Sequence, residues 1–347
     1  MDIEEIVALS VKHNASDLHL CTGQSARWRR QGRLEALEEK APQPESLLTD
    51  WLTQEQWHEL KAFGQLDFAV TLAGEVRLRA NAFQQIHGYS LALRLLSNAC
   101  PKMEALGVPP LVPSLLQMSD GLILVTGATG SGKSTTLAAM VDHLNQSLDG
   151  HILTLEDPVE IIHQAGRCLI QQREIGPNCV TFAAGLKAAL REDPDVILLG
   201  ELRDSETIRL ALTAAETGHL VLATLHTRGA AQAVERLVDV FPAEEKIPIR
   251  SQLAGSLKAV LAQRLEPAKE GGRVALYELL VNTPAVANLI REGKTHQLPG
   301  VLQAGQQHGM CSFAQSEAQL RAQGRLADEQ AGGPETFPHF RKKIDDR

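Results

Sequence analysis

The stretch that decides the fold is GLILVTGATGSGKSTTLAAM, residues 121–140. Its first six residues form the mostly apolar run expected of a buried strand, and from residue 135 a helical pattern begins. Between the two, GATGSGKS (127–134) matches the pattern GxxxxGK[ST]. A strand before and a helix after are the context that a phosphate-binding loop requires, so the motif predicts a nucleotide site. The competing interpretation is a glycine-rich turn that carries a lysine by chance.

Each part of this loop has a chemical task. Its glycines let the backbone turn so that N–H groups converge on phosphate oxygens, and the following helix presents its positive end to the same anion. Lys133 is expected to reach the β and γ phosphates, and the Ser134 hydroxyl to ligate magnesium. The predicted nucleotide-binding residues of the loop are Gly127, Ala128, Thr129, Gly130, Ser131, Gly132, Lys133, Ser134 and Thr135.

Further apolar runs follow the loop and alternate with helical segments. They are HILTL (151–155), DVILLG (195–200) and LVLATL (220–225). Continuous apolar strands separated by helices predict an α/β fold with a parallel sheet covered on both faces. One helix is well bounded, because Asp204 or Ser205 can cap its start and Gly218 can end it. From about residue 230 to 325 the pattern predicts mostly helix.

The rest of the chain is organised around this region. Residues 1–100 are expected to form a small α+β domain, with a helix from residue 3 and strands at 16–20 and 75–83. Prolines at 101, 109, 110 and 113 mark a linker, placed at 101–117. Residues 118–325 are the predicted nucleotide-binding domain, and 326–347, Gly/Pro-rich and then charged, are a predicted flexible tail.

Composition excludes several classes of protein. Apolar residues make up 44% and charged residues 22%, as in globular proteins, and the net charge of −8 argues against a general nucleic-acid-coating protein. No run approaches the roughly 18 apolar residues of a spanning helix, and MDIEEIVALS lacks the basic start of a signal peptide. The five cysteines never occur as CxxC, which indicates reduced cytosolic thiols. A cytoplasmic location is therefore expected.

Acidic and histidine residues lie where a parallel sheet would gather them. Glu156 and Asp157 follow the second apolar run, and Glu201 follows the third. Ligands bind outside the carboxyl ends of such strands, where carboxylates could hold magnesium or position water for in-line attack. Each cluster taken alone could be a turn or a helix cap. His226 closes the fourth run and could sense a γ-phosphate, whereas His219 opens that run and is expected to be structural or to lie near a neighbouring subunit.

Four blocks of the sequence together resemble the secretion-type ATPases of type II secretion and type IV pili. The blocks are GATGSGKSTTLAAM, ILTLEDPVE, LREDPDVILLGELRD and TAAETGHLVLATLHT, which correspond in order to that family's Walker A, Asp box, Walker B and His box. The resemblance continues through SDLHL, VRLRANAF, DVFPAEEK and NLIREGK, and so covers about residues 1–325. It implies a PAS-like N-terminal domain and a RecA-like P-loop NTPase domain, assembled as a homohexamer.

The resemblance also assigns roles to single residues. Lys133 and Ser134 would act on ATP and Mg²⁺, and Glu201 would hold the magnesium with its water. Glu156 would orient the attacking water, and His226 would sense the γ-phosphate. Arginines of a neighbour's N-terminal domain reach the phosphates in this family, and the matching positions here are Arg77, Arg79 and Arg94. Arginines that alternate along a strand also suit a solvated strand face.

Within the family the chain is most similar to pilus retraction motors, because it lacks a long N-terminal region and paired CxxC motifs. The expected function is a hexameric motor that couples ATP hydrolysis to pilus retraction, or to a related pilus or secretion machine, against an inner-membrane platform protein. The retraction block AIRNLIRE is AVANLIRE here, so Val286 and Ala287 depart from it. The alternative is therefore a nucleotide-dependent regulatory or interaction paralogue with little turnover. A nucleic-acid translocase is a third option, and the net charge counts against it.

Overall fold

The computed structural model describes residues 2–13, 15–30, 33–38, 41–72, 76–96 and 100–327. The predicted tail from 326 on lies outside these residues except for its first two positions. The chain divides into two compact units. The first unit joins the described residues up to Lys102 with Ala138–Gly200, and the second joins Met103–Leu137 with the described residues from Glu201 on. The domain limits expected at residues 100 and 118 stay a prediction.

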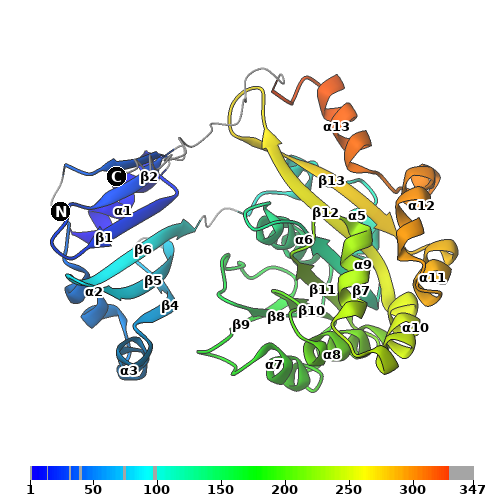
Figure 1. Cartoon of the computed structure of the whole chain (residues 1–347), viewed down its shortest axis with the longest axis horizontal. Helices are drawn as coiled ribbons and strands as arrows, with labels where there is room; N and C mark the ends of the chain where they lie inside the picture. Colours follow the sequence, from blue (N-terminus) through cyan, green and yellow to red (C-terminus); the bar gives the residue numbers. More distant parts are fainter. Residues whose placement is uncertain are drawn as a thin grey trace, which may run out of the picture. The chain divides into compact units, whose positions relative to one another are not determined.

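The first unit contains a six-stranded sheet whose pairings are all antiparallel, in the order β3-β2-β1-β6-β5-β4 (Figure 1). Its strands are β1 (Asp17–Cys21), β2 (Arg27–Arg30), β3 (Arg33–Ala36), β4 (Gln65–Thr71), β5 (Arg77–Gln85) and β6 (Gly88–Leu96). The helices of this part are α1 (Ile3–Lys12), α2 (Pro44–Trp51) and α3 (Gln54–Phe63). The helix predicted from residue 3 and the strands predicted at 16–20 and 75–83 are confirmed.

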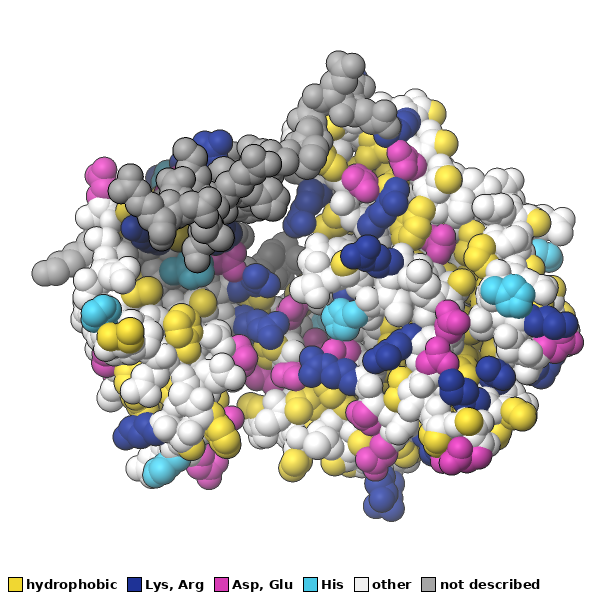
Figure 2. Space-filling model, in the orientation of Figure 1, with side chains coloured by type: hydrophobic (Ala, Val, Ile, Leu, Met, Phe, Trp, Pro, Cys, Tyr) yellow, Lys and Arg dark blue, Asp and Glu magenta, His cyan; other side chains and the backbone are white. Residues whose placement is uncertain are grey.

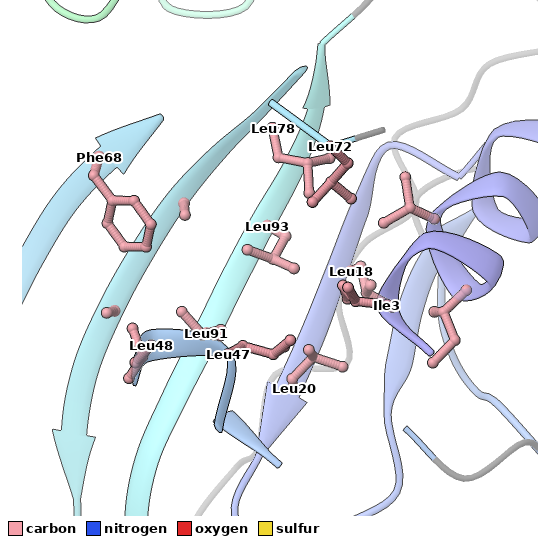
Figure 3. Close-up of a cluster of buried hydrophobic side chains, with 14 of the residues drawn as sticks. Ile3, Leu18, Leu20, Leu47, Leu48, Phe68, Leu72, Leu78, Leu91 and Leu93 are labelled. Atoms are coloured by element: carbon pink, nitrogen blue, oxygen red, sulfur yellow. The ribbon is translucent and has the colours of Figure 1, made fainter. Parts of the chain in front are cut away.

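One face of this sheet forms a hydrophobic core with the helices. Alternate residues of β1, β5 and β6 point into it, and Figure 3 shows Leu18, Leu78 and Leu93 among them, with Leu47 and Leu48 of α2 opposite. Burial of each such leucine contributes about 1.5–3 kcal/mol to folding. Because side chains alternate along a strand, Arg77 and Arg79 of β5 lie on the other face, away from the core.

The first unit also holds three parallel strands in the order β10-β8-β9. These are β8 (His151–Glu156), β9 (Leu169–Glu174) and β10 (Val196–Leu199), accompanied by α7 (Phe182–Ala189) and most of α6 (Lys133–Ser147). β8 and β10 confirm the predicted strands at 151–155 and 195–200. β9 was not expected. Its sequence LIQQRE is mostly polar because the strand lies at the edge of the sheet and none of its residues is fully buried.

The second unit holds four strands in the order β13-β12-β7-β11. They are β7 (Gly121–Thr126), β11 (Leu220–Leu225), β12 (Leu257–Pro267) and β13 (Arg273–Val281). β7 pairs in parallel with β11 and β12, and every residue of β7 and β11 is buried. β13 runs antiparallel to β12, so the expectation of a parallel sheet holds for the other strands only.

The prediction of mostly helix between 230 and 325 was wrong for residues 257–281, which form β12 and β13. The sequence of β12, LKAVLAQRLEP, is rich in helix-favouring Ala, Leu, Gln and Arg. Residues 259–263 are nevertheless all buried, and β12 pairs with β7 from Leu122 to Thr126. Burial against a neighbouring strand therefore overrides the local helix preference.

The second unit's helices surround these strands. They are α4 (Met103–Leu106), α5 (Val112–Leu115), α8 (Ser205–Glu216), α9 (Ala230–Asp239), α10 (Lys246–Ser256), α11 (Pro284–Arg291), α12 (Leu298–Ala304) and α13 (Phe313–Ala322), with 3-10 turns η1 (Ala243–Glu245), η2 (Thr295–Gln297) and η3 (Gly305–His308). α8 contacts β7 and β11, and α9 contacts β12 and β13 (Figure 1). Asp204, not Ser205, caps α8, since its side chain accepts from the backbone N–H of Thr207. Among the described residues no helix has the length and apolarity to cross a membrane.

Candidate nucleotide-binding site

The predicted phosphate loop lies in the second unit between β7 and α6. β7 ends at Thr126, whose hydroxyl donates to the carbonyl of Thr227, 2.7 Å away, and so ties the end of β7 to the segment after β11. Gly130 and Gly132 have φ of +77° and +89°, values that favour glycine. α6 begins at Lys133, two residues before the helical pattern expected from residue 135.

Gln263 of β12, which the sequence did not point to, holds this loop from behind. Its side chain is buried; Oε1 accepts from the Thr136 hydroxyl at 2.7 Å, and Nε2 donates to the carbonyl of Ser131 at 2.7 Å. A Cβ on Gly127 would lie 2.3 Å from the Gln263 carbonyl oxygen, and one on Gly132 would lie 2.8 Å from Nε2. Two of the motif glycines are thus needed for close packing as well as for backbone freedom. A single glutamine in an Ala/Leu-rich run belongs to no motif, so the role of Gln263 could not be predicted from the sequence.

The donors of the loop fit an anionic ligand. Lys133 is buried, and its Nζ donates to the carbonyls of Gly127, at 2.8 Å, and Ala128, at 3.1 Å. Ser131 Oγ is buried and has no hydrogen-bond partner within the described part of the chain. The hydroxyl-bearing Ser134 is exposed and Thr135 is half-buried, while Ala128, Thr129 and Gly130 are exposed at the turn. A buried ammonium group, an orphaned hydroxyl and a turn of glycines are what a bound phosphate chain would use.

The second unit also brings together two predicted residues from separate motifs, Glu201 and His226. Glu201 is buried just after β10, and its Oε2 lies 3.3 Å from Nε2 of His226, which follows β11. Its other oxygen pairs with Arg203, a contact that sequence analysis missed. Leu202 N–H donates to the carbonyl of Thr224 at 3.0 Å and so fixes the backbone beside Glu201. A buried carboxylate whose Arg partner is exposed to solvent is suited to exchange that partner for a cation.

His219 lies at the opposite end of β11 from His226. Its Nδ1 lies 3.0 Å from the carbonyl of Ala214 at the end of α8. This contact fits the structural role considered for it.

Glu156 belongs to the first unit, where it is the last residue of β8. Its Oε1 accepts from the Thr154 hydroxyl at 2.6 Å and from Nε2 of Gln172 at 3.2 Å. Burial raises the pKa of Glu156, and the two donors and the charge of Arg77 act in the opposite direction, while the charge of Glu160 adds to the rise. Gln172 was missed together with its strand. A carboxyl held by one oxygen is an arrangement that can orient water.

Two of the three predicted arginines form ion pairs inside the first unit. Arg77 Nη2 lies 2.9 Å from Oε2 of Glu174, and the two side chains are 15% and 14% exposed. Arg94 Nε lies 3.0 Å from Oδ1 of Asp17, and the Arg94 side chain is 60% exposed. Arg79 is opposite Arg94 in the register of β5 and β6. The arginines thus share one sheet face, and their action on a neighbour's phosphates stays a prediction.

Surface charge is mixed rather than gathered by sign. On the face that Figure 2 shows, dark-blue basic and magenta acidic side chains alternate over the helices of the second unit. The observation agrees with the net charge of −8.

Comparison with known proteins gives the family. Residues 1–330 match the family described as Type II/IV secretion system protein. The chain is 70% identical to "Uncharacterized protein YggR" of Escherichia coli K12, covering 94% of this chain and all of that one. It is 46% identical to the "Type IV pilus retractation ATPase PilT" of Pseudomonas aeruginosa, covering 97% of this chain and all of that one.

Solved structures agree with this match. The crystal structure of the pilus retraction motor PilT with bound ADP superposes with a TM-score of 0.87 at 40% identity, covering 97% of this chain and 98% of that one. The ATPase DotB of Legionella pneumophila superposes with a TM-score of 0.79 at 27% identity, covering 94% and 93%. The mixed α/β structure is consistent with a RecA-like ATPase fold.

The site and the comparisons thus define the class: the chain belongs to the Type II/IV secretion system protein family and is a secretion-type ATPase. The predicted resemblance and enzyme class are confirmed.

Proposed function

We propose that this chain is a motor of the pilus-retraction type. It couples hydrolysis of magnesium-ATP to retraction or disassembly of a pilus, or to work on a related pilus or secretion machine. The observation that carries the proposal is the likeness to the ADP-bound PilT structure over 97% of the chain, with the phosphate loop built as described.

Each site residue has a proposed task. The backbone N–H groups of the loop and Lys133 hold the phosphates, and Ser134 and Glu201 hold magnesium, which when bound neutralises charge on the transferred phosphoryl group. Glu156 orients the attacking water through its second carboxyl oxygen. His226 senses the γ-phosphate from its place beside Glu201. Arginines of the outer sheet face, Arg77, Arg79 and Arg94, would neutralise phosphate charge in a neighbouring subunit.

The proposed assembly is a homohexamer in the cytoplasm, docked on an inner-membrane platform protein. In this arrangement the N-terminal part of the first unit is a PAS-like domain, and exchange of ATP for ADP moves subunits against each other. The support is the family membership and the 46% identity to PilT over 97% of the chain. No nucleic acid takes part.

The first test replaces Lys133 with Ala. We expect phosphate release to fall by at least about 100-fold, because the ammonium group that neutralises the phosphates is lost. Lys187→Ala, which removes an exposed lysine of α7, is the matched control and should keep the parental rate. Circular dichroism should be unchanged in both variants. Hydrolysis by Lys133→Ala at the parental rate would overturn the assignment.

A second candidate function is a regulatory paralogue that binds nucleotide with little turnover. The retraction block that this sequence resembles has Arg where Ala287 stands, and here both Val286 and Ala287 are buried on α11. Arg would add a charge and up to five donors at that place. Phosphate release by the purified parental protein decides, since negligible release at saturating magnesium-ATP favours this candidate. Loss of pilus retraction on gene deletion, with active hydrolysis, favours the motor.

A further inference from the structure

The edge strand β9 lines up two polar side chains on one face with two from β8. In the parallel register Gln172 is opposite Thr154, and Glu174 is opposite Glu156. Residues two apart on a strand share a face, so these four side chains form one polar row. Three of them are linked by hydrogen bonds, because Thr154 and Gln172 both donate to Oε1 of Glu156.

The amide of Gln172 has its orientation fixed by backbone groups. Its Oε1 accepts from the N–H of His163 at 2.9 Å, and its Nε2 donates to the carbonyl of Ile161 at 2.9 Å. A flipped amide would set NH₂ against N–H and C=O against C=O, and both bonds would be lost. Nε2 must therefore face Glu156. The segment after β8 in this way determines which atom of Gln172 meets the carboxyl group.

Both donors reach the same carboxyl oxygen. Oε1 of Glu156 receives the hydroxyl of Thr154 and the amide of Gln172, whereas Oε2 has no protein hydrogen bond among the residues that the structure describes. A carboxylate oxygen can accept two hydrogen bonds, so Oε1 is fully engaged. Oε2 is left to accept from water.

We propose that Gln172 is a positioning residue for ATP hydrolysis: it fixes Oε1 of Glu156 so that Oε2 accepts a hydrogen bond from the attacking water. This inference rests on the role proposed above for Glu156. Gln172 itself touches neither nucleotide nor water in this scheme. Thr154 is its partner in the same task.

The charges around Glu156 give the inference a pH signature. Glu160 and Glu174 are the acidic groups that face it, and Arg77, paired with Glu174, is the basic one. Donors on a carboxylate stabilise its ionised form, so losing one raises the pKa of Glu156 further above its ordinary value. A water-orienting carboxylate works ionised. The acid limb of the kcat profile should therefore move to higher pH when Gln172 loses its amide.

The experiment compares Gln172→Leu with Gln171→Leu in steady-state phosphate release from pH 5 to 9. Gln171 is the adjacent glutamine, points to the other face of β9 and contacts His151 instead. For Gln172→Leu we expect kcat at neutral pH to fall about tenfold. The KM for ATP should stay within about twofold, and the acid limb should move up by about one pH unit. Gln171→Leu should match the parental protein.

Thr154 supplies a second pair of variants. Thr154→Val should move the acid limb in the same direction, and Thr154→Ser, which keeps the hydroxyl, should restore it. Equal loss of activity at every pH in Gln172→Leu, or a profile like that of Gln171→Leu, would overturn the inference. Glu156→Gln distinguishes a failure of the role proposed for Glu156 from a failure of the positioning role proposed for Gln172. If it hydrolyses ATP at the parental rate, the role of Glu156 and the inference fail together; if it is inactive while Gln172→Leu is normal, the inference alone fails.

Discussion

The phosphate loop, residues 127–134, and the segment after β8, residues 157–163, both follow a buried parallel strand but are held in different ways. The loop is shaped by its own glycines and by Lys133, which bonds back to two loop carbonyls. One residue from elsewhere, Gln263, completes it. Side chains of β9 hold the segment after β8. Gln172 forms hydrogen bonds with the backbone of Ile161 and His163, and the Glu174 carboxylate accepts from the N–H of Val159.

The two regions differ in whether the residues that fix their conformation lie within the region or elsewhere in the sequence. A loop that is shaped by its own residues repeats the same residues at the same spacing, and can be identified as a motif. A segment shaped by side chains about ten to fifteen positions away has no spacing of its own to detect. Side chains that bond to backbone can in addition serve many local sequences, because every residue offers the same backbone groups.

The largest effect is expected where the loop meets Gln263. Gly127→Ala would place a Cβ 2.3 Å from the carbonyl oxygen of Gln263 and 2.5 Å from Oγ of Ser131. A backbone oxygen cannot turn aside, so we expect the free energy of unfolding to fall by about 3 kcal/mol, measured by urea denaturation.

Gly218→Ala is the control for that variant. Gly218 also has positive φ, +108°, but an added Cβ there would meet no atom within 4 Å. Its cost should be about 1 kcal/mol, from backbone strain alone. Equal losses in the two variants would show that close packing does not shape the loop.

A smaller effect is expected from Gln263→Leu. The Thr136 hydroxyl and the Ser131 carbonyl would lose buried partners, at a cost of about 2 kcal/mol in the free energy of unfolding. Adding Thr136→Val removes the orphaned hydroxyl, so the double variant should lose less than the sum of the two single variants. Strict additivity would mean that Gln263 does not support the loop through Thr136.

The smallest effect is expected on the β9 side. Glu174→Gln keeps an oxygen for the Val159 N–H but removes the charge that faces Arg77, so we expect the free energy of unfolding to fall by about 1 kcal/mol, with little dependence on salt because the pair is mostly buried. Asp17→Asn, which breaks the exposed pair with Arg94, should cost less than about 0.5 kcal/mol. An unchanged free energy of unfolding in Glu174→Gln would mean that the charge is irrelevant to this contact.

The strands and loops whose residues form a local pattern could be predicted from the sequence. The strand before the loop, the helix after it and the strand ends at Glu156 and Glu201 lie where the apolar runs placed them. The contact between Glu201 and His226 follows from parallel strands that end at one edge. Family resemblance supplied the enzyme class.

The missing parts depend on tertiary contacts. β12 has a helix-favouring composition and becomes a strand only because β7 offers it a buried partner. β9 is an edge strand, so its polar sequence lacks an apolar run. Gln172, Glu174 and Gln263 all lie on these two strands. The residues that position the site were therefore not predicted, because the strands that carry them were not predicted.

The orphaned hydroxyl of Ser131 has a thermodynamic consequence. Ser131 Oγ is buried and has no hydrogen-bond partner among the residues that the structure describes, which costs the nucleotide-free protein about 1–3 kcal/mol. A ligand oxygen that accepts from it returns this energy on binding, and it does so only for the folded chain. Nucleotide binding therefore stabilises the folded protein through this hydroxyl as well as through the other loop contacts. The melting temperature should rise with nucleotide concentration, and by more than in a loop whose hydroxyl already has a partner. The loop thus favours the stability of the nucleotide-bound protein over that of the nucleotide-free protein.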